Sequence, residues 1–107
     1  MASGTLNMYK TTQHATVNSK LTGTFTYSTV GHVCIGCGTF TVNTAITAYE
    51  TVVSDLPETV DGNPYMGVFV TDHTGYNEYY VSGKNILTRE ALSVGTTLRI
   101  MCVYMCK

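Results

Sequence analysis

The stretch GTTLRIMCVYMC, residues 95–106, decides the fold of this chain. Successive side chains of a β-strand point to opposite faces, so a strand over this stretch carries two rows of side chains. One row contains Leu98, Ile100, Cys102, Tyr104 and Cys106. The other row contains Thr97, Arg99, Met101, Val103 and Met105. A small antiparallel domain normally keeps one face in its core and the other in water, so two apolar rows predict a second covering surface.

The rest of the chain has the same period of two. Apolar and polar residues alternate over 21–28 and again over 39–47, and turn residues recur every eight to twelve positions. This pattern predicts an all-β fold, an antiparallel β-sandwich of jelly-roll type with seven or eight short strands over residues 21–107. We expect residues 1–20 to be an N-terminal arm or an edge strand.

Two local features interrupt the strand pattern. The run Gly36-Cys37-Gly38 predicts a bulge or sharp bend, because glycine tolerates the dihedral angles that such a bend requires. The segment Thr88–Leu92 is the only helix-like signal, and we expect one helical turn there.

Composition excludes several classes of function. The 107 residues suffice for one domain and carry six Lys and Arg against seven Asp and Glu, a net charge of −1. Nucleic-acid binding and capture by an anionic membrane both need a basic surface, so we expect neither. There is no run of 18 apolar residues to cross a membrane, and the N-terminal residues do not resemble a signal peptide. We therefore expect synthesis in a cytoplasm without membrane insertion.

The four cysteines leave three alternatives open. Cys34 and Cys37 have the spacing C-x₂-C, and Cys102 and Cys106 the spacing C-x₃-C, so four thiolates could hold a zinc ion. However, residues four apart on a strand lie about 13 Å apart, which is too far to share an ion. The alternatives are a disulfide to a terminal cysteine or, as we favour, reduced and buried thiols that pack as small hydrophobic side chains. We predict no metal site.

The order of the predicted strands resembles that of a known family, the head domains of bacteriophage tail fibres and baseplate receptor-binding proteins. Four segments carry the resemblance: a first core hairpin (32–42), a strand with a Leu-Pro turn (52–57), a glycine hairpin (81–86) and a closing strand (92–104). Together they cover roughly residues 30–106, and their order and spacing are more specific than any one of them.

The resemblance implies a homotrimeric virion protein that binds a host-surface saccharide or protein and contacts other virion proteins. Independently of the resemblance, the closing strand has two apolar rows, and one core can bury only one of them. Three copies around an axis would bury the other row. The predicted contact between copies contains Arg99, Met101, Val103 and Met105.

Aromatic and polar residues in two segments suit a saccharide, because aromatic rings stack on sugar rings and polar side chains bind hydroxyl groups. The candidate ligand-binding residues are Asp72, His73, Tyr76, Asn77 and Tyr80, with Asn63 and Tyr65 on a neighbouring loop. The alternative is that these tyrosines pair across strands and fill the core.

The sequence has no nucleophile elbow, no His-Glu-x-x-His and no phosphate-binding glycine loop, so we expect neither an enzyme nor a cofactor. Two alternatives to a receptor-binding head stay open. One is a purely structural role in capsid or fibre decoration or in trimerisation, and the other, more remote, is a zinc-stapled cytosolic binding domain.

Overall fold

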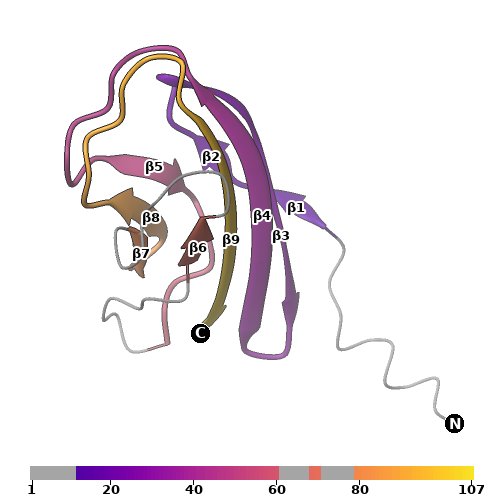
Figure 1. The fold of residues 1–107 in the computed structure, drawn as a ribbon. Helices are drawn as coiled ribbons and strands as arrows, with labels where there is room; N and C mark the ends of the chain where they lie inside the picture. The colour runs from indigo at the N-terminus through magenta and orange to yellow at the C-terminus, as the bar shows by residue number, and fades with distance from the viewer. Residues whose placement is uncertain (1–11, 61–67, 71–78) are drawn as a thin grey trace, which may run out of the picture.

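A computed structural model describes residues 12–60, 68–70 and 79–107, and it confirms the all-β sandwich that the sequence predicts. The described part contains two antiparallel sheets and no helix (Figure 1). It therefore contains no helix long and apolar enough to cross a bilayer. The strands are β1 (Gln13–His14), β2 (Thr16–Val17), β3 (Leu21–Val30), β4 (Val33–Val42), β5 (Thr51–Ser54), β6 (Val68–Val70), β7 (Tyr79–Ser82), β8 (Asn85–Thr88) and β9 (Thr97–Met105).

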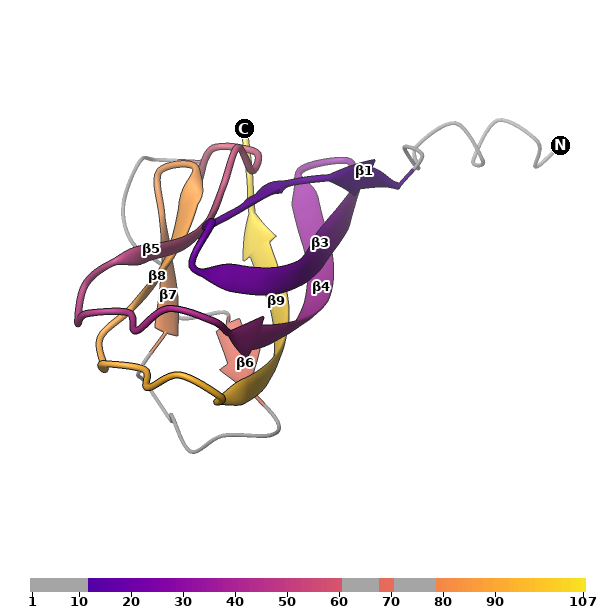
Figure 2. The same cartoon turned by 90° about the horizontal axis from the view of Figure 1, so that it is seen from above.

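The two sheets face each other across one core. The five-stranded sheet has the order β1-β3-β4-β9-β6, and the four-stranded sheet has the order β2-β5-β8-β7. Figure 2 shows the layers from above, with β3, β4 and β9 on one side and β5, β8 and β7 on the other. The strands β1 and β2, which fall within the predicted arm or edge strand, lie at an edge of each sheet.

The core lies between the sheets and draws on all the long strands. Its largest fully buried side chains include Phe25, Phe40, Ile46, Tyr79, Ile86, Leu92, Leu98 and Ile100. The rings of Phe25 and Phe40 stack with their centroids 6.4 Å apart. Because successive side chains of a strand point to opposite faces, this packing leaves Ile35, Cys37, Thr39 and Thr41 of β4 exposed on the outer face.

The predicted bulge at residues 36–38 is wrong. Strand β4 pairs with β3 and with β9 in an unbroken register through these residues. A Cβ built on Gly36 would lie 2.6 Å from a ring carbon of Phe25, and one built on Gly38 would lie 2.9 Å from the same ring. These glycines therefore leave room for a buried aromatic ring, and they do not bend the strand.

The predicted helical turn at Thr88–Leu92 is also wrong. Thr88 ends β8, and Leu92 forms a β-bridge with Ile46, with backbone N···O distances of 2.9 and 2.8 Å. The chain around Ile46 and the chain around Leu92 thus run side by side beyond the strands (Figure 1). Five residues form too few intrahelical bonds to nucleate a helix against this bridge.

Candidate functional site

The closing strand β9 has the two faces that its sequence predicts. Leu98, Ile100, Cys102 and Tyr104 are buried, and the residues between them are exposed. On the exposed side, 47% of Met101, 44% of Val103 and 50% of Met105 is accessible to solvent. A lone sandwich does not cover this row within the described residues, which makes the outer face of the five-stranded sheet the candidate site.

The strand register joins this row to apolar residues of β3 and β4. Val103 lies opposite Ile35, which is 47% exposed, while Met101 lies opposite Cys37. Residues that are directly opposite in an antiparallel pair share one face of the sheet, so these side chains form one surface. We call this surface the apolar end; it consists of Val30, Val33, Ile35, Cys37, Met101, Val103 and Met105.

The other end of the same outer face consists mainly of threonine side chains. There Thr39 lies opposite both Thr24 and Arg99, and Thr41 lies opposite both Thr22 and Thr97. We call these six residues the threonine end; all six are exposed. Arg99, which the sequence placed in the predicted contact with the three apolar residues of β9, belongs to this second surface.

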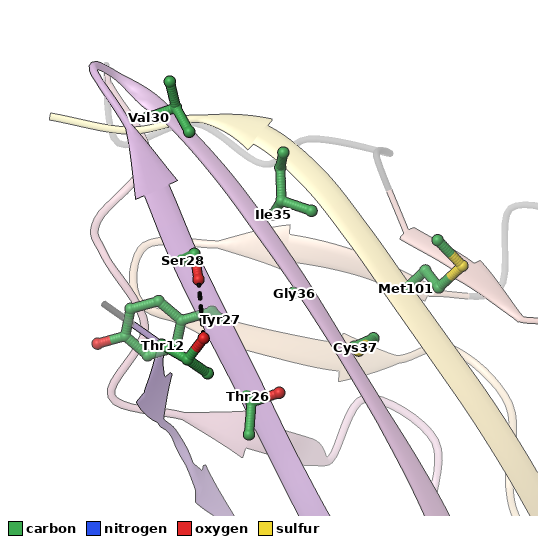
Figure 3. A pocket seen from close by; sticks show the side chains of 9 residues that line it. All are labelled: Thr12, Thr26, Tyr27, Ser28, Val30, Ile35, Gly36, Cys37 and Met101. Atoms are coloured by element: carbon green, nitrogen blue, oxygen red, sulfur yellow. Dashed lines mark hydrogen bonds between the residues drawn. The ribbon is translucent and has the colours of Figure 1, made fainter. Parts of the chain in front are cut away.

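A groove opens along the apolar end beside β3. Its volume is about 400 Å³, and Ile35, Cys37 and Met101 line one side of it (Figure 3). On the β3 side, the hydroxyl groups of Thr12 and Ser28 lie 3.4 Å apart, within hydrogen-bonding distance. The groove therefore has an apolar wall on β4 and β9 and a polar margin where β1 meets β3.

The composition of the apolar end decides what it can do. Six of its seven residues are exposed, and contiguous apolar patches on the surface of a monomer are often functional. Burying such a patch is favourable, and the centre of a protein–protein contact is depleted in charged residues, so the apolar end has the composition expected at the centre of a contact.

The cysteines behave in two ways. Cys34, Cys102 and Cys106 are buried free thiols in the core, as the favoured alternative predicts, whereas Cys37 is exposed, so the prediction of burial is wrong for this residue. Cys37 differs because β4 runs straight through it and turns its side chain to the outer face. Hydrogen bonding to Cys34, together with burial, holds the pKa of Cys102 far above its usual value. Among the described residues, no three His, Cys, Asp or Glu side chains lie together in a way that could hold a metal ion.

Most candidate ligand residues lie outside the described part of the chain. These are Asn63, Tyr65, Asp72, His73, Tyr76 and Asn77. The remaining candidate, Tyr80 on β7, is half-buried, and the Arg89 guanidinium lies 4.8 Å from its ring centroid. Tyr80 is thus held in a cation–π contact on the four-stranded sheet.

The sequence analysis did not predict that residues of β4 belong to the apolar end. Val33, Ile35 and Cys37 alternate with small or buried residues, which was the available signal. Because a bend was predicted at residues 36–38, the alternation was not followed through β4. The sequence of β4 also does not show that β9 is its neighbour.

Comparisons of this chain with protein-family models, with curated proteins and with solved structures found no match.

Proposed function

We propose that this chain is a homo-oligomeric binding module of a bacteriophage particle, in which the apolar end forms the contact between copies. The observation that supports the proposal is the alignment of exposed apolar residues across β3, β4 and β9, centred on the Ile35–Val103 pair. Such a surface is costly to leave in water, and a second copy supplies a partner of the same chemistry.

The chemistry of the apolar end favours another copy over a charged partner. None of its seven residues is an aspartate, glutamate, lysine, arginine or histidine. The centre of a protein–protein contact is depleted in charge, and its polar margin is partly solvated. The threonine end, with Arg99, has the composition of such a margin.

The resemblance to tail-fibre head domains supports a trimer in the virion that attaches to a host-surface saccharide or protein. Three copies around an axis would each turn the apolar end inward. Several weak ligand contacts on one particle would then act together, because each bound copy raises the effective concentration for the next.

Alkylation of Cys37 tests the contact directly. Cys37 is the only exposed cysteine of the chain, and the three buried thiols serve as internal references. We expect iodoacetamide to modify Cys37 at least about tenfold more slowly in concentrated than in dilute protein, because association covers it. Ile35→Asp, which places a charge at the centre of the apolar end, should restore fast alkylation at high concentration.

Thr41→Asp is the matched control, because Thr41 is exposed on the same strand and the same face but lies at the threonine end. It should leave the protection of Cys37 in place. Equal alkylation rates at all concentrations in the unmodified chain would contradict the proposed contact.

A further inference from the structure

The edge of β3 that faces β1 is open at one end. Strand β1 pairs only with Tyr27 and Thr26, although β3 continues to Val30. Among the described residues, no strand pairs with Thr29 or Val30 on this edge. An open strand edge presents N–H and C=O groups that can pair with another extended segment. This end of β3 is therefore a candidate site for an added strand.

The backbone of β3 is oriented for such a strand. The Ala15 N–H donates to the Phe25 carbonyl at 3.0 Å, so the backbone groups of Phe25 point to this edge. In an antiparallel pair every second residue exchanges backbone hydrogen bonds with the same neighbour. The N–H and C=O of Thr29, four residues after Phe25, therefore point to the open edge as well.

The chain itself leads into this site. Gln13 pairs with Tyr27, and the hydroxyl of Thr12, the first described residue, lies 3.4 Å from that of Ser28. These contacts show that the antiparallel register of β1 continues for one residue beyond the strand. The residues that precede Thr12 in the sequence therefore start at the open edge.

A cavity lies on each side of the open edge. On the outer side is the groove of about 400 Å³, which Thr12 and Val30 help to line (Figure 3). On the inner side is a second cavity, of about 250 Å³, which Thr29 and Gly31 help to line. Successive side chains of a strand point to opposite faces, so a strand along this edge would place its side chains alternately in the two cavities.

We propose that residues 8–11 of the same chain occupy this edge as an extension of β1. The register of β1 places Thr11 opposite Thr29 and Lys10 opposite Val30. Thr11 then points into the inner cavity. Lys10 points to the outer groove, where its alkyl chain can cover Val30 while its ammonium group stays in water.

The extension brings two larger side chains to the end of β3. Tyr9 belongs to the inner row and would lie beside Gly31, which has no side chain to exclude it. Met8 belongs to the outer row and would lie next to Val30, a residue of the apolar end. The N-terminal segment thus adds Met8 to the contact between copies, and only this last step rests on the proposed function.

Disulfide trapping in the full chain tests the pairing. In dilute protein with Cys37→Ser, which removes the only exposed cysteine, Lys10→Cys combined with Val30→Cys should form an intramolecular disulfide when diamide is added. Their Cα atoms would lie about 4.5 Å apart, which a disulfide can span. Lys10→Cys combined with Thr29→Cys is the matched control. It should oxidise at least about tenfold more slowly, because the two side chains point to opposite faces of the sheet.

Equal oxidation rates of the two pairs, or a disulfide that joins two chains, would overturn the inference. Trapping does not require association, so it gives the same answer if the proposed contact between copies fails.

The contribution of Met8 to the contact is measured separately, by light scattering over a dilution series. Met8→Asp should raise the dissociation constant of the oligomer at least about tenfold, whereas Asn7→Asp, in the other row of the same segment, should raise it less than about threefold. Equal effects of the two changes would overturn the place of Met8 in the contact.

Discussion

The same three strands, β3, β4 and β9, form both ends of the outer face, yet one end is apolar and the other consists mainly of threonines. The inner face beneath them does not change in this way, because Cys34 and Tyr104 are buried below the apolar end and Phe40 and Leu98 below the threonine end. Core packing therefore does not require apolar residues on the outside. The proposed contact between copies, which would cover only the apolar end, accounts for this difference.

The largest expected effect comes from overpacking the core beneath the apolar end. Gly36→Ala would place a Cβ 2.6 Å from the buried ring of Phe25, and overpacking of this kind lowers the free energy of unfolding by about 3 kcal/mol. Gly31→Ala is the matched control. It meets no atom within 4 Å but has a φ of 58°, so it should cost only about 1 kcal/mol. Urea unfolding of both variants measures the difference, and equal losses would argue against tight packing under Gly36.

The next largest effect concerns association. Val103→Asp puts a charge into the centre of the apolar end, and we expect it to raise the dissociation constant of the oligomer at least about 100-fold. Thr97→Asp makes the same change on the same strand at the threonine end, and it should raise the dissociation constant less than about fivefold. Light scattering over a dilution series measures both constants. Similar effects of the two changes would mean that the distinction between the ends has no bearing on assembly.

A third expected effect is a loss of stability at acid pH that depends on Glu50 and leaves association unchanged. Hydrogen bonds from Lys20 and Thr47 lower the pKa of Glu50 from its usual value near 4.5 to about 2. A lowered pKa means that Glu50 contributes stability above about pH 4.5, and that this contribution disappears as the pH falls through about 2.

Thermal unfolding between pH 2 and pH 7 tests this contribution, because Glu50→Gln should cost about 1 kcal/mol at neutral pH and flatten the acid-side loss. The dissociation constant should be the same at pH 5 and pH 7, because no residue of the apolar end has a carboxyl or imidazole group. An acid-side profile that Glu50→Gln leaves unaltered would contradict the role given to this carboxylate.

The smallest expected effect comes from making one residue of the threonine end apolar. Thr39→Val replaces an exposed hydroxyl at the threonine end with a methyl group on a strand, and it should change the free energy of unfolding by less than about 0.5 kcal/mol. Because it extends the apolar surface along β4, it should tighten association by no more than a few-fold. Weakened association would show that the Thr39 hydroxyl itself takes part in the contact.

Alternation and regularly spaced turn residues along the chain were enough to predict a sandwich, and the period of two in β9 separates the row of Ile100, which is buried, from the row of Met101, because alternation is a local property of a strand. The glycines of β4 could not be interpreted from sequence. Gly36 is small because Phe25, eleven residues earlier, packs against it, and sequence alone does not show that contact. The apolar end depends in turn on the pairing of Ile35 with Val103, which are far apart in the chain.

Of the candidate ligand residues, only Tyr80 lies in the part of the chain that the structure describes. The sequence singles it out by its place in an aromatic run, and the structure places it half-buried on β7. Cys37 was predicted to be buried because free cysteine usually is, and the straight course of β4 exposes it.

The central claim is that the apolar end holds copies of this chain together, and the solution mass tests it most directly. Sedimentation equilibrium of the unmodified chain at about 100 μM should give about 35 kDa, three times the 11.6 kDa of one chain. A mass of two chains would keep the contact but contradict the trimer. A mass of 11.6 kDa at that concentration would contradict the claim itself.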